Sequence, residues 1–320
     1  MRYSAELGVA LQAALEAARI CQLARRRSGL GQWAKEDGSW VTVADLASQA
    51  LIEQAIAEAF PDDRIIAEES FGALADGSGA DVAGRVLQFL GDELGERGKQ
   101  AYSIATAEPG RHSQSERCWL IDPLDGTSGY LGGRQYATAV ALMEGSSVVV
   151  GVLCCPELPT PDGGNPGCVL ATTRGRGTVW RSLFDGAEHL ARVSSEAQPR
   201  IERIYQSVEQ GHSSSDVVER LRRAFGSQAS TLKMDSQCKY AEVACGRADG
   251  YVRFSGGQNY RECLWDHAAG AILLENAGGR VTDGAGRALI WEARQRFERS
   301  SGIVATNGHI HDQIIEVFNG

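Results

Sequence analysis

The stretch from Trp119 to Thr127, WLIDPLDGT, constrains the fold of this chain more than any other. An apolar run reaches Asp122. The next residue, Pro123, fixes φ and lacks an N–H, which predicts the end of regular strand pairing. Gly126 permits a tight or left-handed backbone that brings the chain back toward the first aspartate. We therefore expect two carboxylates, the backbone carbonyl of Leu124 and a threonine hydroxyl to meet at the end of a strand.

Oxygen-only clusters of this kind suit hard cations such as Mg²⁺. The alternative is an Asp-rich turn that binds nothing. Net charge is −9 and no basic block occurs, which argues against binding to a nucleic-acid duplex. An acidic protein that handles an anionic substrate needs local cations to reverse its field, and a metal cluster would supply them.

With 320 residues, the chain is expected to form two subdomains or one large layered fold. The polar, Pro-containing join at Ser194–Pro199 is the candidate boundary between residues 1–196 and 197–320. Eight cysteines occur without a C-x-x-C pair, so the sequence supports neither a structural zinc site nor a thioredoxin-like motif. Several lie in apolar runs and are interpreted as small buried hydrophobes, and a reducing cytosol fits better than secretion. A cytoplasmic protein is expected, with an organelle left open. No membrane association is expected, and the protein is predicted to be a monomer or homodimer.

The alternation of strands and helices beyond Pro199 predicts an α/β architecture for the second half of the chain. Helices are predicted at Ser4–Arg27, Ala44–Ala59, Ser214–Phe225, Ser236–Cys245, Asp266–Asn276 and His309–Phe318. Strands are predicted at Arg64–Ala67, Tyr136–Met143, Ser147–Cys155, Val169–Thr173, Thr178–Leu183, Arg203–Ser207, near Thr231, Gly250–Phe254 and Ile303–Thr306. Residues Trp33–Thr42 are predicted to be an extended arm or hairpin. Residues 71–115 are interpreted as a surface insertion with one helix near Val82–Leu94.

Further carboxylates follow or open these elements. Glu68 and Glu69 end a short apolar strand and should point to opposite faces, so at least one can face a site. Asp45 opens a helix, where a cap is the simpler role. Asp266 opens a helix of small residues that can approach other backbone closely, and a helix N-terminus favours a nearby phosphate. The simpler reading of Asp266 is again an N-cap.

Three motifs together resemble a known enzyme group: Glu68-Glu69-Ser70, Asp122-Pro123-Leu124-Asp125-Gly126-Thr127 and Trp265-Asp266-His267-Ala268-Ala269-Gly270. They resemble the magnesium-dependent, lithium-sensitive phosphatase superfamily, which includes inositol monophosphatases, fructose bisphosphatases and 3′(2′),5′-bisphosphate nucleotidases. The resemblance runs in order over nearly the whole chain. It implies a layered αβαβα sandwich of the sugar/inositol phosphatase type, with an α+β half followed by an α/β half.

The chain looks most like the bisphosphate nucleotidase branch. The long spacing between Glu68 and Asp122 supports this resemblance. Four segments support it as well: Glu209-Gln210-Gly211-His212-Ser213-Ser214, Asp235-Ser236-Gln237-Cys238-Lys239-Tyr240, Tyr251-Val252-Arg253 and Tyr260-Arg261-Glu262. Two departures occur, since Ser128 and Gly132 stand where these nucleotidases commonly carry lysine and arginine. Arg134 is a candidate substitute. The segment from Gly279 to Ser300 is short and only loosely similar.

The resemblance implies two or three Mg²⁺ per site. One would be held by Glu68, Asp122 and the Leu124 carbonyl, and a second by Asp122, Asp125 and Asp266. Asp45 and Thr127 would polarise the attacking water. A small-molecule nucleotide would be bound by Gly126, Thr127, His212, Ser236, Lys239, Arg253 and Asp266.

The implied reaction converts adenosine 3′,5′-bisphosphate to AMP and phosphate, with its sulfated form as a second substrate. An inositol or sugar phosphatase on the same metal site is the nearest alternative. A regulator without catalytic activity is a further one. Ser236 and Lys239 are expected to lie on one face of a helix, because they are three residues apart. Trp265 is interpreted as core rather than as a base-stacking residue.

Overall fold

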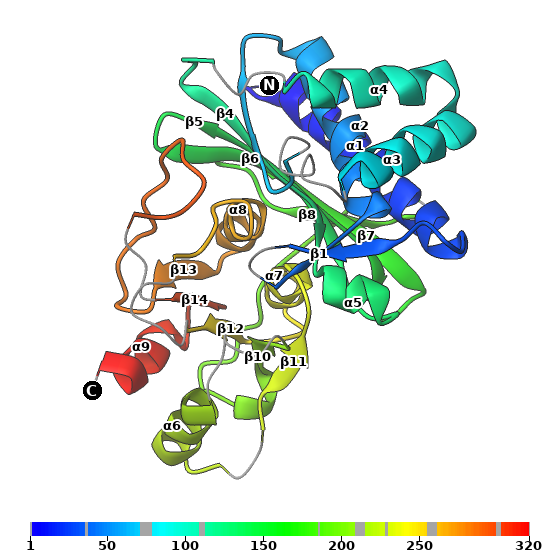
Figure 1. The fold of residues 1–320 in the computed structure, drawn as a ribbon. Helices are drawn as coiled ribbons and strands as arrows, with labels where there is room; N and C mark the ends of the chain where they lie inside the picture. Colours follow the sequence, from blue (N-terminus) through cyan, green and yellow to red (C-terminus); the bar gives the residue numbers. More distant parts are fainter. Residues whose placement is uncertain are drawn as a thin grey trace.

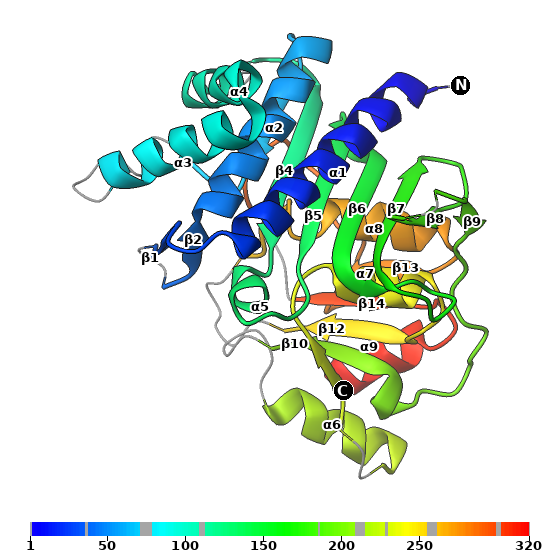
Figure 2. The same ribbon diagram turned by 90° about the vertical axis from the view of Figure 1, so that its right-hand side faces the viewer.

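The computed structural model describes residues 2–35, 38–70, 79–108, 113–184, 186–208, 215–227, 230–254, 261–298 and 302–319. Within these residues, helices and sheets form five layers in the order αβαβα (Figures 1 and 2). Paired helices cover a seven-stranded sheet, two shorter helices separate it from a five-stranded sheet, and two more cover the far face. The layered fold expected from the sequence is therefore confirmed.

The outer helical layer contains α1 (Ser4–Arg26) and α2 (Val43–Ala59), joined by the hairpin β1 (Gln32–Ala34) and β2 (Trp40–Thr42). The alanine-rich face of α1 packs against the large sheet. By length and composition α1 could also cross a membrane, a test that a core helix of this kind passes too. Two further helices, α3 (Gly79–Leu94) and α4 (Glu96–Thr106), pack beside α2.

The seven-stranded sheet has the order β3-β4-β5-β6-β7-β8-β9. Its strands are β3 (Arg64–Ala67), β4 (Arg117–Asp125), β5 (Ala137–Glu144), β6 (Ser147–Pro159), β7 (Pro166–Thr173), β8 (Val179–Ser182) and β9 (His189–Leu190). Only β3 and β4 pair in parallel, so their C-terminal ends lie side by side. Because β4 carries the Asp-rich stretch and Glu68 follows β3, this edge brings the first carboxylates together.

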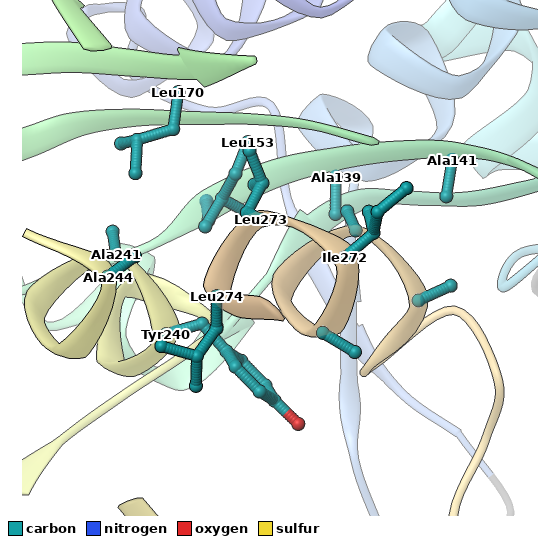
Figure 3. Packing of buried hydrophobic residues seen from close by; sticks show 14 of the residues in the cluster. Ala139, Ala141, Leu153, Leu170, Tyr240, Ala241, Ala244, Ile272, Leu273 and Leu274 are labelled. Atoms are coloured by element: carbon teal, nitrogen blue, oxygen red, sulfur yellow. The ribbon is translucent and has the colours of Figure 1, made fainter. Parts of the chain in front are cut away.

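The middle layer consists of α7 (Cys238–Ala244) and α8 (Ala268–Asn276). Figure 3 shows Ile272 and Leu273 of α8 and Ala241 of α7 packed with side chains of the large sheet, in a mostly aliphatic cluster. A methyl group at Gly151 of β6 would lie 2.4 Å from a side-chain carbon of Ile272. The same methyl group would lie 3.1 Å from the Ala269 carbonyl, so the first turn of α8 lies close to the backbone of β6.

The five-stranded sheet has the order β11-β10-β12-β14-β13 and mixes parallel and antiparallel pairs. Its strands are β10 (Ile204–Ser207), β11 (Leu232–Met234), β12 (Gly250–Arg253), β13 (Arg280–Asp283) and β14 (Ile303–Thr306). A 3₁₀ turn at Ile201–Arg203 precedes β10. The last layer, α6 (Ser215–Phe225) and α9 (His311–Asn319), packs on its outer face.

Several sequence-based expectations need correction. The region 71–115 contains a second helix, α4, whose sequence ERGKQAYSIAT lacks a continuous apolar stripe. Strand β13 lies in the segment after Gly279, which is only loosely similar to the phosphatase family and for which no strand was expected. The helix expected from Ser236 begins at Cys238, and the helix expected from Asp266 begins at Ala268. The seven cysteines other than Cys245 are buried, as expected for those in apolar runs, and all eight are free thiols.

Candidate active site at the junction of the two sheets

The Asp-rich stretch forms the end of β4 and the turn after it. Regular pairing with β5 ends at Asp122, directly before Pro123, as expected. Strand β4 nevertheless continues, and pairing resumes at Asp125 after an irregularity in which one extra residue of β4 is accommodated. Thr138 of β5 donates a hydrogen bond to the Pro123 carbonyl at 3.0 Å. Gly126 then adopts the predicted left-handed backbone, with φ of 88°, and the short helix α5 (Thr127–Leu131) follows.

A cavity of about 420 Å³ opens over this turn. Its walls come from the β1–β2 hairpin, the end of β4, the start of α5, β12 and the segment before α8. The lining residues include Lys35, Trp40, Glu68, Asp122, Leu124, Asp125, Gly126, Thr127, Ser128, Arg253, Trp265, Asp266 and Arg296. Every predicted metal ligand therefore lines one cavity. Trp265 is buried in the core, as interpreted, but one edge also borders this space.

The clustered carboxylates repel one another. Burial, the largest cause, raises the pKa of Asp122 well above its ordinary value, and neighbouring Glu68, Asp125 and Asp266 raise it further. Burial also raises the pKa of Asp266 and brings that of Asp125 to about 6. The Oδ1 atom of Asp122 is buried without a hydrogen-bond partner. An all-oxygen donor set with a buried, unsatisfied oxygen fits Mg²⁺.

Asp45 lies behind the turn and connects it to α2. The Asp45 carboxylate accepts hydrogen bonds from the N–H and hydroxyl of Thr42, at 2.8 and 2.5 Å, in a capping box. Its other oxygen accepts a hydrogen bond from the Thr127 hydroxyl at 3.0 Å. The carboxylate therefore both caps the helix and orients Thr127. Burial is the main cause that raises the pKa of Asp45 to about 6.

The glutamate pair does not point to opposite faces, because β3 ends before it. Lys35, on the loop of the β1–β2 hairpin, reaches both carboxylates, at 2.9 Å from Glu68 and 2.5 Å from Glu69. Burial lowers the pKa of Lys35, but these two carboxylates outweigh it and raise the pKa above its ordinary value. Gln49 of α2 bonds both the N–H and the carbonyl of Glu69. Sequence reasoning missed Lys35, since nothing in the polar hairpin pattern indicated which side chain would turn inward.

A second, smaller pocket of about 30 Å³ adjoins the cavity. The two share four lining residues: Asp125, Gly126, Arg253 and Asp266. Ser207, Ser236, Lys239 and Tyr251 complete much of its wall. Ser236 and Lys239 do meet here, but not on one helix face, because Ser236 precedes α7 with φ of 67°.

Lys239 is buried in this pocket. Its ammonium donates a hydrogen bond to the Met234 carbonyl at 3.0 Å and lies 5.1 Å from the centroid of the Tyr251 ring. Burial, the largest cause, lowers the pKa of Lys239 to about 8, while the charge of Asp125 acts in the opposite direction. A buried cation beside the carboxylate cluster can attract an anion that enters from the cavity.

Arg253 stands between the two pockets. It lies 2.9 Å from Glu262 and 3.5 Å from Asp266 as an ion pair. His267 is buried beside them, 3.4 Å from Glu262 and 2.9 Å from the Tyr240 hydroxyl. Glu262, Asp266 and His267 offer ligand atoms within 4.8 Å of one another. The Arg253 guanidinium already supplies a positive charge to these three side chains. We therefore interpret the three as the group that holds Arg253 in place.

Two expectations on substrate recognition fare differently. Arg134 does not line the cavity. Its guanidinium pairs with Asp235 at 2.9 Å, so it is not the extra cation that we considered there. Arg296 borders the cavity instead. His212 and the motif around it lie outside the described residues, so their placement stays a prediction.

The layered αβαβα sandwich, with acidic side chains at the junction of its sheets, defines a class of metal-dependent phosphatases. The chain matches the inositol monophosphatase family over residues 3–320 and belongs to it. Members of this family generally depend on Mg²⁺.

Among proteins of known function, the chain is similar to the 3′(2′),5′-bisphosphate nucleotidase of Dictyostelium discoideum, with 34% identity over 88% of this chain and 86% of the relative. The enzyme of that name from Schizosaccharomyces pombe is 31% identical, over 99% and 95%. Among solved structures, the extragenic suppressor protein suhB of Bartonella henselae has the same fold, with a TM-score of 0.70, 23% identity and 98% coverage of both chains.

Proposed function

We propose that this protein is a Mg²⁺-dependent phosphatase that hydrolyses the 3′-phosphate of adenosine 3′,5′-bisphosphate, giving AMP and phosphate. The observation that carries the proposal is the pair of adjoining pockets, one acidic and one containing a buried lysine. A substrate with two phosphates can place one in the acidic cavity and direct the other toward the buried lysine. The names of relatives that match this chain nearly end to end support the same substrate.

The carboxylates supply the metal ligands. We propose that Glu68, Asp122 and the Leu124 carbonyl hold one Mg²⁺, and that Asp122, Asp125 and Asp266 hold a second. Bound Mg²⁺ neutralises charge on the phosphoryl group and makes water more acidic. Binding would also satisfy the unpartnered oxygen of Asp122 and relieve the repulsion that raises its pKa. A third Mg²⁺ would assist Asp45 and Thr127 in polarising the attacking water.

Thr127 and Asp45 prepare the attacking water. The Thr127 hydroxyl donates its hydrogen to Asp45, so a lone pair on the hydroxyl oxygen remains to accept a hydrogen bond from water. The two bonds from Thr42 hold Asp45 in this orientation. As the water attacks, its proton can pass to the Thr127 oxygen while the Thr127 hydroxyl proton passes to the Asp45 carboxylate. The raised pKa of Asp45 favours accepting that proton.

Substrate recognition falls to the second pocket. Lys239 and Ser236 provide a cation and a hydroxyl for the phosphate that does not react. Arg253 lies between the pockets and can contact either phosphate. The absence of a side chain at Gly126 lets Ser236 lie close to the turn, since a methyl group there would lie 3.0 Å from the Ser236 side chain. His212 is proposed to contact the nucleotide as well. The protein is further proposed to be cytoplasmic and to act as a monomer or homodimer.

The decisive experiment measures phosphate release with Mg²⁺ from a panel of compounds. The panel contains adenosine 3′,5′-bisphosphate, its sulfated form, 3′-AMP, inositol 1-phosphate and fructose 1,6-bisphosphate. We expect the two adenosine compounds with phosphates at both positions to have the highest kcat/KM. A clear preference for inositol or sugar phosphates would instead identify the alternative phosphatase, which the same acidic cavity could support. No release from any of them would refute catalysis.

A further inference from the structure

Gln237 touches both sides of the acidic cluster although it does not line the larger cavity. It stands between Ser236 and the first residue of α7, and its side chain is buried. Its backbone N–H donates a hydrogen bond to the Asp125 carboxylate at 2.5 Å. Its side chain contacts the segment that carries Asp266. One residue thus joins carboxylates contributed by the two halves of the sequence.

The side-chain amide of Gln237 makes two bonds that flank Asp266. Its Nε2 donates to the Trp265 carbonyl at 3.0 Å. Its Oε1 accepts from the Gly270 N–H at 3.2 Å. Gly270 is in the first turn of α8, where N–H groups have no partner inside the helix. The amide therefore fixes both the peptide before Asp266 and the start of the helix after it.

We propose that Gln237 is a positioning residue for the metal site, setting the separation between Asp125 and Asp266. These two carboxylates come from different layers, the end of β4 and the segment before α8, and would share one Mg²⁺, so this inference rests on the ligand set of the proposed function. Mg²⁺ requires near-ideal octahedral geometry at short metal–oxygen distances, which makes the spacing of its ligands critical. Partners that orient a metal ligand typically contribute roughly 10- to 100-fold to metal affinity or activity.

Two substitutions separate positioning from packing. Gln237→Met keeps the side-chain length and the backbone bond to Asp125 but removes both amide bonds. Gln237→Glu keeps an acceptor for the Gly270 N–H, replaces the donor to the Trp265 carbonyl by a carboxyl oxygen and adds an acidic group beside the cluster. The matched control is Gln54→Met. Gln54 is also buried, but it lies on α2 and bonds Glu58 at 2.9 Å, away from the carboxylate cluster.

The experiment titrates the metal-free full-length protein with Mg²⁺ alone, by calorimetry, and records Tm with and without Mg²⁺. We expect Gln237→Met to weaken Mg²⁺ binding at one class of site by roughly 10- to 100-fold. Because a bound ligand stabilises the folded state according to its affinity, the rise in Tm on adding Mg²⁺ should shrink. Gln237→Glu should show the same effect, and Gln54→Met should keep the wild-type response.

The proposal is overturned if both Gln237 variants bind Mg²⁺ as the wild type does. It is also overturned if their Tm falls by the same amount with and without Mg²⁺, or if neither folds, since Gln237 would then serve the fold alone. Failure of the proposed function gives a different result. In that case the wild-type protein would bind Mg²⁺ but release no phosphate from the substrate panel, while the comparison of variants would still be valid.

Discussion

Asp125 is the residue at which the metal cluster and the smaller pocket meet. Its carboxylate is held by the Gln237 N–H and lies near Lys239, which lowers its pKa against the stronger effect of burial. Asp125→Asn keeps the shape of the side chain but removes a charged ligand. We expect phosphate release to fall by more than about 100-fold, beyond the loss typical of residues that only orient a ligand. The measurement is kcat at saturating Mg²⁺, with a Tm in EDTA no lower than that of the wild type as the control for folding. Near-normal turnover would contradict the two-metal assignment.

Lys239 gives the test of selectivity. A hydrogen bond to a charged group contributes roughly 1.5–3 kcal/mol. Lys239→Met should therefore lower kcat/KM for adenosine 3′,5′-bisphosphate by about ten- to a hundredfold. Hydrolysis of 3′-AMP, which has no second phosphate, should change much less. A similar loss on both substrates would show that Lys239 supports the fold through its bond to the Met234 carbonyl.

For single residues, the sequence indicates which side chains belong to the site but says little about how they are arranged. The motif residues Glu68, Asp122, Asp125 and Asp266 line one cavity, as their motifs indicate, although their roles stay predictions. The link between Ser236 and Lys239 was argued from helical spacing and is wrong, because a left-handed φ at Ser236 delays the helix. Contacts such as that of Lys35 with the glutamate pair depend on a hairpin folding over a distant strand end. No local pattern specifies such a contact.

Helix α8 determines where Asp266 lies relative to the carboxylates of β4, because Asp266 lies just before it. The helix packs so tightly on β6 that a methyl group at Gly151 would lie 2.4 Å from Ile272 and 3.1 Å from the Ala269 carbonyl. Gly151→Ala should push α8 and the preceding Asp266 away from the sheet. Overpacking of this kind costs about 1–3 kcal/mol. We expect a lower midpoint in urea unfolding and a higher Mg²⁺ requirement for activity.

Gly8→Ala is the matched control for that prediction. Gly8 lies inside α1, and a methyl group there would contact nothing within 4 Å. Replacing a glycine by alanine inside a helix should stabilise the protein by up to about 1 kcal/mol. If both variants had the same stability, the close approach of α8 to β6 would not constrain the position of α8.

Long periodic elements were predictable, whereas short ones were not. The apolar stripe of α1 and the β-branched run of β6 determined their type. In α4, by contrast, only Ala101 and Ala105 among its hydrophobic residues are buried, together with Gly98, so the helix presents almost no apolar pattern. Strand β13 has four residues and depends on pairing with β14, which comes more than twenty residues later. Tertiary context decides such elements.

For the whole molecule, the consequence of this layering is that the candidate site belongs to neither half alone. Asp122 and Asp125 end a strand of the large sheet, while Asp266 and Lys239 belong to the middle layer formed by the second half. The division into residues 1–196 and 197–320 stays a prediction, and the helices of the second half pack directly on the first sheet. Only the resemblance to a family could place these distant segments together, because periodicity carries no information on which faces meet.

The pH dependence of stability follows from the same clustering of charge. In the metal-free protein the pKa values of Asp45 and Asp125 lie near 6, above their ordinary value of 3.8. A carboxyl group whose pKa is raised on folding binds more protons in the native state. Its stabilising contribution is complete below about pH 4 and is lost as pH rises through about 6. In EDTA, the site should therefore destabilise the protein between pH 5 and 7.5, and Mg²⁺ should offset that loss by neutralising the carboxylates.

Asp122→Asn isolates this effect from carboxylates elsewhere, because it removes one charge from the centre of the cluster. We expect the variant in EDTA to lose less Tm between pH 5 and 7.5 than the wild type, and Mg²⁺ to raise its Tm much less. The measurement is thermal unfolding at both pH values, with and without Mg²⁺ at constant ionic strength. Equal pH dependence in the two proteins would mean that the cluster is already neutralised from within, with Lys35 at Glu68 as the nearest internal cation. The acidic cavity would then be built as a closed ion-pair network, and its need for metal would have to be argued from catalysis alone.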